Sequence, residues 1–153
     1  VDMFVKFECD NFKRAIIDNY REKIDPAFDG QEISPDMMEK FDLLDINDYG
    51  ITSIEGIQNA KNLRLLYMAN NEIKDLTPLK ECGKLEILDF QRNQVEDIWP
   101  LELLRRLESL NIAYNKITDV MALNDIANID SINISGNTIE NRLPLRHIRF
   151  VKK

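Results

Sequence analysis

Apolar residues recur along this chain with a constant period. Segments of equal length begin at Phe41, Leu63, Leu85, Leu107 and Ile129, with no insertion or deletion between them, so that each contains twenty-two residues. When each segment is numbered from its first residue, positions 1, 4, 6, 11, 14, 17 and 20 are apolar in the first four segments. Positions 4 and 6 fall on one face of a strand, because strand side chains alternate. A single segment cannot bury its apolar edge alone, so we expect successive segments to stack and share one core.

Polar residues also keep their place in each segment. Position 9 is Asn in four segments, and we expect these amides to satisfy buried backbone groups where the chain turns away from its strand. The predicted structural ladder comprises Asn71, Asn93, Asn115 and Asn137. Position 13 is Ser or Asp in the first four segments, before a short apolar stretch, which favours capping of a short helical turn over a cation site. Trp99, at position 15, is expected to pack in part under a neighbouring turn, and a second contact site is the alternative.

Strict repetition at this period predicts a leucine-rich-repeat solenoid of the α/β class. We expect a right-handed coil with a parallel concave β-sheet, a convex side of 3₁₀ turns and irregular segments, and an α-helical N-terminal cap. The predicted organisation is one structural domain: a cap over residues 1–40, five repeats over 41–139 with the last incomplete, and a closing segment over 140–153.

Residues outside the repeats predict how the two ends of the core are closed. In the cap, Asp10 is expected to begin a helix through residues 11–24, and Ser34 a second helix from Pro35 to about Lys40. The closing segment is expected to cover the last strand irregularly. Its candidate packing residues are Leu143, Leu145, Ile148 and Phe150.

Charge and composition narrow the classes of partner. The chain has 153 residues and a net charge of −7. Residues 142–153 hold five cations and no acid, which leaves 15 cations against 27 acids elsewhere. An acidic body argues against nucleic acid, and no apolar run is long enough for membrane insertion. Cys82 is expected to be a small buried apolar residue, because its position is apolar in the other repeats.

The motifs of the chain resemble those of internalin-type repeats from bacterial surface proteins. The repeat LRLLYMANNEIKDLTPLKECG carries the resemblance, together with the cap segments CDNFKRAII, DPAFDGQEISPDMM and LLDINDYGITSIEGIQNAKNL. The resemblance covers about residues 8–139 and implies a protein partner held on the concave sheet. It also implies a bacterial extracellular or cell-surface location, with a cytoplasmic location as the alternative. The first ten residues lack the basic start and apolar run of a signal peptide.

The candidate partner-binding surface lies at positions 3, 5, 7 and 8, which we expect to face outward on the concave side. Leu43, Leu65 and Ile87 would form an apolar stripe beside Tyr67, and such patches often mark interfaces. The alternative is that these aliphatic residues only favour strand pairing or meet the cap. The predicted surface comprises Leu43, Asp45, Leu65, Tyr67, Ile87, Asp89, Gln91, Arg92, Asn111 and Tyr114.

Catalytic and metal-binding patterns are not evident. The single histidine, His147, has no acid–base partner, metal-ligand spacing or phosphate loop beside it. Asp25, Asp29, Gly30 and Asp36 only partly match a calcium loop, and a plain turn is favoured. We therefore expect no enzyme activity, cofactor or metal, and a monomer that binds protein. The alternatives are an intracellular regulatory scaffold resembling phosphatase regulators, and a structural spacer within a larger surface protein.

Overall fold

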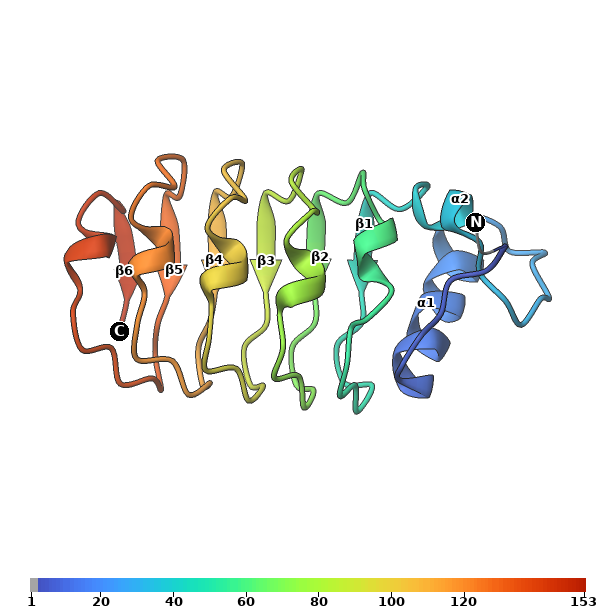
Figure 1. The fold of residues 1–153 in the computed structure, drawn as a ribbon, viewed down its shortest axis with the longest axis horizontal. Coiled ribbons are helices and arrows are strands. Elements are labelled where there is room, and N and C mark those ends of the chain that lie inside the picture. The colour runs from blue at the N-terminus through green and yellow to red at the C-terminus, as the bar shows by residue number, and fades with distance from the viewer. Residues whose placement is uncertain (1–2) are drawn as a thin grey trace.

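The computed structural model describes residues 3–153 and confirms the predicted leucine-rich-repeat solenoid (Figure 1). Two helices, α1 (Asp10–Lys23) and α2 (Pro35–Met38), precede a series of short strands and turns. The strands are β1 (Leu43–Asp45), β2 (Leu65–Tyr67), β3 (Ile87–Asp89), β4 (Ser109–Asn111), β5 (Ser131–Asn133) and β6 (Phe150–Lys152). None of the helices within residues 3–153 is long and apolar enough to cross a membrane.

The six strands form one parallel sheet in chain order. The pairing repeats without a shift: Leu44 of β1 lies beside Leu66 of β2, and Leu66 lies beside Leu88 of β3. Leu88, Leu110 and Ile132 continue the same row through β4 and β5. Equivalent positions therefore lie side by side, and each outward-facing position forms a row across the concave sheet.

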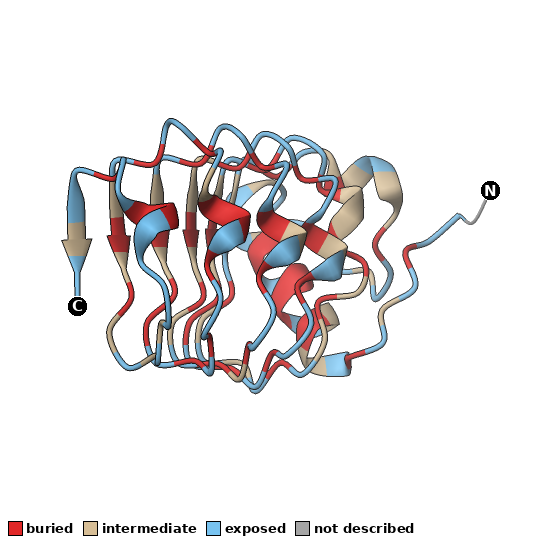
Figure 2. Cartoon of the chain, turned by 60° about the vertical axis from the view of Figure 1, so that its left-hand side comes forward, coloured by how far each residue is buried: buried red, intermediate tan, exposed pale blue. Residues whose placement is uncertain are grey.

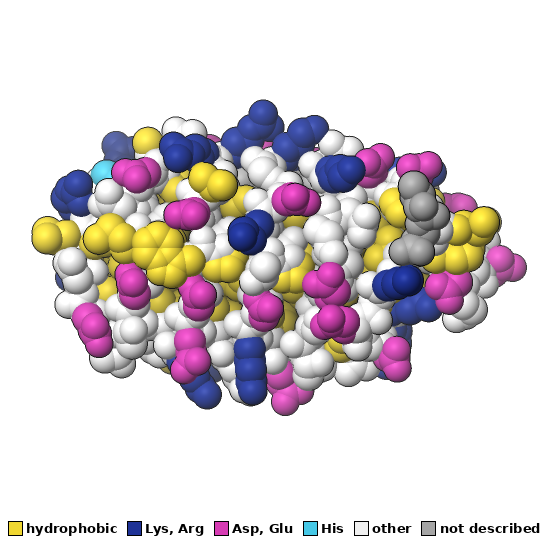
Figure 3. All heavy atoms as spheres, viewed as in Figure 1, with side chains coloured by type: hydrophobic (Ala, Val, Ile, Leu, Met, Phe, Trp, Pro, Cys, Tyr) yellow, Lys and Arg dark blue, Asp and Glu magenta, His cyan; other side chains and the backbone are white. Residues whose placement is uncertain are grey.

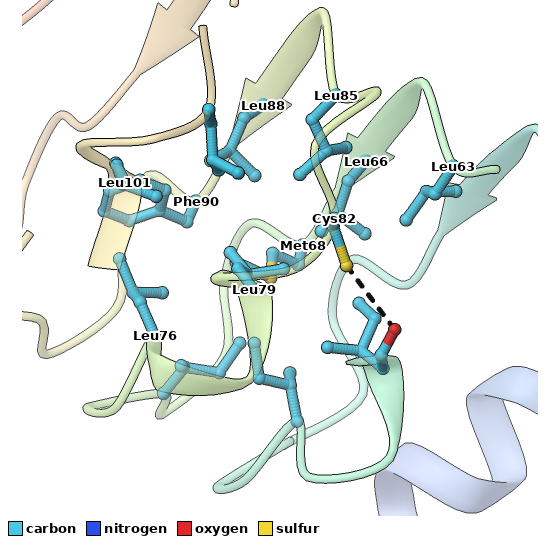
Figure 4. Packing of buried hydrophobic residues seen from close by; sticks show 14 of the residues in the cluster. Leu63, Leu66, Met68, Leu76, Leu79, Cys82, Leu85, Leu88, Phe90 and Leu101 are labelled. Atoms are coloured by element: carbon cyan, nitrogen blue, oxygen red, sulfur yellow. Dashed lines mark hydrogen bonds between the residues drawn. The ribbon is translucent and has the colours of Figure 1, made fainter. Parts of the chain in front are cut away.

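The core lies between the sheet and the convex turns and runs the length of the coil (Figure 2). Every inward position of the first four repeats is at most 2% exposed. Figure 4 shows Cys82 within this packing, its Sγ donating a hydrogen bond to the carbonyl oxygen of Ile57 at 3.5 Å. Burial, and then the charge of Glu81, raises the pKa of the Cys82 thiol to about 12. The Cys82 thiol therefore stays protonated and uncharged at neutral pH. This agrees with the prediction that Cys82 is a small buried apolar residue.

The position 9 asparagines connect successive coils through hydrogen bonds. The Oδ1 atom of Asn71 accepts from the backbone N–H groups of Tyr49 and Ile51, both at 3.0 Å. Its Nδ2 atom donates to Ile46 at 3.0 Å in the preceding coil and to Met68 at 3.1 Å in its own. Asn93, Asn115 and Asn137 repeat the Nδ2 contacts one coil further each time, and each accepts one N–H group, from Ile73, Val95 and Ile117 respectively. The amides thus satisfy backbone groups that the turn leaves without a strand partner.

Short 3₁₀ turns form the convex side in each coil. These turns are η1 (Ile57–Asn59), η2 (Thr77–Leu79), η3 (Trp99–Leu101), η4 (Met121–Leu123) and η5 (Leu143–Leu145). Asp75, Asp97 and Asp119 each accept a 2.8 Å hydrogen bond from the backbone N–H two residues later, at the start of η2, η3 and η4. Each aspartate directly precedes the N-cap residue (Leu76, Ile98 or Val120), so it satisfies the first N–H of the turn without being the N-cap itself. Within the described residues, no group of three or more His, Cys, Asp or Glu side chains could hold a metal ion.

The N-terminal cap covers the first coil with helix α1. The buried face of α1 carries the side chains of Phe12, Ile16, Ile17 and Tyr20. The prediction that Asp10 caps this helix is wrong, because Cys9 is the N-cap residue and makes no side-chain cap. Asp10 instead lies in the first turn, where its charge faces the positive end of the helix dipole. Ser34 does cap α2: its Oγ atom accepts from the Met37 N–H at 3.2 Å.

The closing segment adds a regular rung, which corrects the expectation of an irregular cover. Ser131 of β5 pairs with Phe150 of β6, just as Ser109 of β4 pairs with Ser131. The step along the chain from Ser131 to Phe150 is three residues shorter than the step from Ser109 to Ser131, so the last return to the sheet is shortened. Leu145 and Ile148 are buried, but Leu143 and Phe150 are 65% and 58% exposed and do not join the core. Strand β6 presents only partly buried and exposed residues (Figure 2).

Candidate protein-binding surface

Position 3 forms an outward row across the concave sheet. Leu43, Leu65 and Ile87 lie side by side on β1, β2 and β3, and each is partly buried. Ser109 and Ser131 continue the row on β4 and β5, with their Oγ atoms 3.3 Å apart. The row is thus aliphatic on three strands and polar on the next two.

Position 5 forms a second row parallel to the first. Asp45, Tyr67, Asp89, Asn111 and Asn133 pair in register on β1 to β5, and Lys152 completes the row on β6. Tyr67 therefore lies between two acidic residues and next to the aliphatic row. The character of the sheet changes along the coil, from apolar and acidic on β1–β3 to amide on β4–β5 and basic on β6.

A hollow of about 540 Å³ lies over the C-terminal half of this face. It is lined by small and amide side chains of β4 and β5 and is bordered by Arg149, Phe150 and Lys152. Phe150 was predicted to pack in the core, but its backbone pairs with Ser131, so it occupies the position 3 row. The shortened final return explains why sequence spacing did not place it there.

Position 7 departs in part from the expected surface. Ala69 and Ala113 are buried, at 4% and 0% exposed, so these two residues do not present a side chain to a partner. Gln91 is partly buried, and its Nε2 atom donates to Asp89 Oδ2 at 3.2 Å. Gln91 and Asp89 therefore form one polar unit beside Ile87.

Position 8 lies in the turn after each strand and not on the sheet itself. The backbone there is left-handed in four non-glycine residues: Asp48, Asn70, Arg92 and Tyr114 have φ between 56° and 61°. Asp and Asn tolerate this conformation, whereas it is strained for larger side chains. The guanidinium carbon of Arg92 lies 4.3 Å from the centroid of the Tyr114 ring. Arg92 and Tyr114 thus form an exposed cation–π pair, which we call the turn ridge, along the edge of the concave face.

The glycine at position 8 of the fifth repeat leaves room for this ridge. Gly136 has φ of +71°, and a Cβ atom at this position would overlap the Tyr114 ring. Any side chain here would displace the ring. The turn ridge therefore depends on three consecutive repeats, although only Arg92 and Tyr114 were predicted from the sequence as surface residues.

Sequence reasoning considered only Trp99, as a partly packed residue or a second contact, and missed the exposed apolar row to which it belongs. Trp99, Met121 and Leu143 occupy position 15, at the start of η3, η4 and η5, and are 45%, 44% and 65% exposed. Leu103, four residues after Trp99, is 61% exposed. Figure 3 shows this convex stripe, defined by these four residues, as apolar atoms across the turns. Its signal in the sequence is an apolar residue at position 15 of the third, fourth and fifth repeats, where the first two repeats have Glu55 and Thr77.

Comparisons with known proteins agree with this architecture. Sequence models described as leucine-rich repeats match residues 61–105 and 105–120. No curated protein matches the chain. The structure of an internalin (InlF) from Listeria monocytogenes superposes with a TM-score of 0.83 and 23% identity over 95% of this chain and 43% of that one. Two structures of the CBM51-2 and INT domains of Clostridium perfringens ZmpB superpose with a TM-score of 0.52 and 24% identity over 74% of this chain and 21% of theirs.

Repeat sequence, parallel sheet and 3₁₀ turns together define a leucine-rich-repeat fold, and domains built from this repeat generally bind proteins. Within that class the fold is internalin-like, from the helical cap through the repeats. The chain spans less than half the length of the internalin that it matches.

Proposed function

We propose that this chain is a non-catalytic module that binds a protein partner on its concave sheet. The observation that carries the proposal is the row of Leu43, Leu65 and Ile87, which the strand register places side by side on the concave face. Aliphatic side chains at outward positions on three adjacent strands leave an apolar surface in contact with water, and a partner would remove it.

The residues around this row suit the edge of an interface. Tyr67 offers a large partly buried ring between Asp45 and Asp89. The turn ridge adds Arg92 and Tyr114, residue types enriched among the anchors of protein interfaces. Their left-handed backbone belongs to the turn that recurs at position 8 of every repeat, so the turn itself sets where these two side chains lie. The contact is thus expected to extend from Leu43 to Tyr114.

A secreted or surface-displayed bacterial protein is the proposed setting. The internalin-like cap and repeats support it, as does a match to a longer internalin. An intracellular regulatory scaffold and a structural spacer are the alternatives. A spacer would display other parts of a longer protein and would retain no ligand by itself.

The concave site is tested by the double variant Leu65→Asp, Ile87→Asp. Both side chains point away from the core, so we expect an unchanged circular dichroism spectrum and a loss of partner binding of at least about a hundredfold, because two buried carboxylates are left unpaired. The partner is first identified by mass spectrometry of proteins retained on the immobilised chain. Binding of that purified protein is then measured by calorimetry.

The matched control is Ser109→Asp, Ser131→Asp, which adds the same charges at the same repeat position on β4 and β5. We expect it to bind more tightly than the Leu65 and Ile87 variant. Equal binding by the wild type and the Leu65 and Ile87 variant would exclude the aliphatic row as the contact. If the wild type retains no protein in any extract, the spacer alternative is favoured instead.

A further inference from the structure

The convex stripe gathers exposed apolar side chains on the face opposite the concave sheet. Half of the exposed large apolar residues within the described chain belong to it: Trp99, Leu103, Met121 and Leu143, out of eight. Each turn presents position 15 at its start, with a cap on one side, so the three side chains follow one line across η3, η4 and η5. The concave partner proposed above cannot cover this stripe, because the core lies between the two faces.

The stripe also has a hollow between two of its side chains. A space of about 150 Å³ is lined by the apolar residues Trp99, Leu103, Met121 and Ala122 and by the polar residues Glu102, Arg105, Asn124 and Asp125. An apolar side chain from an opposing surface fits such a space. The convex stripe therefore has a depression that a side chain from another protein surface could fill, and close packing of this kind favours association.

The two borders of the stripe carry opposite charge. One border, positions 12 and 13 of the second to fifth repeats, holds five acids and one cation, Lys74. We call it the acidic rim: Asp75, Glu96, Asp97, Asp119 and Glu140. Figure 3 shows acidic side chains in a line directly below the apolar atoms.

The opposite border follows each turn and is basic on balance. At positions 18 to 22 of the second to fifth repeats it holds five cations, against the acids Glu81, Glu102 and Asp125. Arg149, also in this range, is left out because it borders the concave hollow. We call it the basic rim: Lys80, Lys84, Arg105, Arg106 and Arg146. In Figure 3, Lys and Arg side chains gather along the top of the same face. The stripe is therefore an apolar line with one acidic and one basic border.

We infer that the convex stripe is the contact between two copies of this chain, related by a two-fold axis parallel to the axis of the solenoid. A two-fold contact uses the same patch on both copies. Rotation about this axis places each apolar row on its own equivalent and sets the acidic rim of one copy against the basic rim of the other. Rotation about the perpendicular axis in the same plane would set acid against acid and base against base, which costs free energy.

A second copy of the chain fits this surface because the chain itself carries the pattern of apolar and charged residues that a partner would need. A different partner would need an apolar ridge with a basic border on one side and an acidic border on the other. The chain itself has that pattern in the required order. The expected state at high concentration is therefore a back-to-back dimer, with both concave sheets facing outward, instead of the monomer that sequence analysis predicted.

The test is sedimentation equilibrium of the purified chain at concentrations from about 10 to 500 µM, a range that detects weak dimers. We expect a rise from the mass of one chain to that of two. Met121→Asp, at the centre of the stripe, should weaken association by at least about tenfold, while circular dichroism stays unchanged. Phe150→Asp is the matched control, since Phe150 is similarly exposed but lies on β6, and its dimer should be unaffected. A monomer at every concentration, or a dimer lost in Phe150→Asp but kept in Met121→Asp, overturns the inference.

Charge reversal tests the direction of the axis. Glu96→Lys with Glu140→Lys leaves the acidic rim with three acids and three cations, and so without net charge, while keeping every aspartate that accepts a turn N–H. Arg105→Glu with Arg146→Glu makes both rims acidic. Each variant alone should associate at least about tenfold more weakly than the wild type, and an equimolar mixture should recover the dimer. Added salt should weaken the wild-type dimer, because its rims attract. Wild-type association that strengthens with salt would mean that like rims face each other and would refute the proposed axis.

Discussion

The two ends of the solenoid are closed by different means. At the N-terminal end, the Asn19 side chain of α1 reaches the outer edge of β1, where its Oδ1 atom accepts from the Asp45 N–H at 3.1 Å. Its Nδ2 atom donates to the Asp45 carbonyl oxygen at 2.9 Å. A helix side chain thus substitutes for a neighbouring strand. At the C-terminal end, β6 has a strand partner only on the β5 side.

Strand β6 is short and has cationic residues in and beside it, and no helix within residues 3–153 covers it. Strand β6 has three residues, and Arg149, Lys152 and Lys153 surround it. Short, cationic edge strands resist pairing with other edges. Within the described residues, helix α1 packs on the first coil, whereas no helix covers β6. The two ends should therefore contribute unequally to stability.

The largest expected difference is between two phenylalanines, one at each end. Phe12 of α1 is 0% exposed and contacts Phe7 edge to face at a centroid distance of 5.5 Å, whereas Phe150 is 58% exposed. Phe12→Ala should lower the free energy of unfolding by about 3–5 kcal/mol, because it leaves a cavity. Phe150→Ala should lower it by less than about 0.5 kcal/mol. Urea titration followed by circular dichroism measures both, and equal losses would contradict the contrast between the ends.

Substitutions in the asparagine ladder should also cost more stability near the N-terminal end than near the C-terminal end, with a smaller difference than between the two phenylalanines. Asn71 is 8% exposed and accepts two N–H groups, while Asn137 is partly buried and accepts the Ile117 N–H at 3.0 Å. Asn71→Ala leaves buried donors and acceptors unpaired and should cost about 3 kcal/mol, whereas water can replace the amide in Asn137→Ala, which should cost about 1 kcal/mol. Urea titration measures the loss in the free energy of unfolding for both variants. Hydrogen exchange at the Ile51 and Ile117 amides shows which part of the chain has lost protection. A larger cost at Asn137 would contradict the gradient.

Repetition explains which parts of this molecule could be predicted from its sequence. The core positions recur in each of the first four repeats, so four observations of each position support one structural assignment. Residues outside the repeat have no such support. Asp10 matched a general helix-start pattern, but Cys9 occupies the cap position because the chain enters the helix one residue earlier.

The candidate surface was predictable only where it follows the repeat. Positions 3 and 5 face outward in register, but the left-handed turn at position 8 depends on backbone angles that Arg92 and Tyr114 do not suggest. Ala69 and Ala113 are too small to reach beyond the neighbouring backbone, so their outward position does not expose them. The β6 rung escaped prediction because three residues are missing from the final return, which shifts Phe150 into the row that Ser131 occupies in the preceding coil.

The smallest expected effect is a pH dependence at the junction between the cap and the first repeat. The Tyr49 hydroxyl donates to Asp18 Oδ2 on α1 at 2.9 Å. Burial, and then this hydrogen bond to Asp18, raises the pKa of Tyr49 to about 12 from its ordinary value of 10.0. The neutral phenol is thus favoured in the folded state. Its contribution to stability is complete below pH 10 and is lost as the pH rises through about 12.

Tyr49→Phe isolates this titration from those of the other tyrosines. The wild type should lose more stability than the variant between about pH 10 and 12, by less than about 1 kcal/mol because Tyr49 is only partly buried. Urea midpoints measured across that range give both slopes. Parallel slopes would mean that Tyr49 titrates alike in the folded and unfolded chains, so that the contact between α1 and the first coil does not discriminate between the charged and the neutral ring.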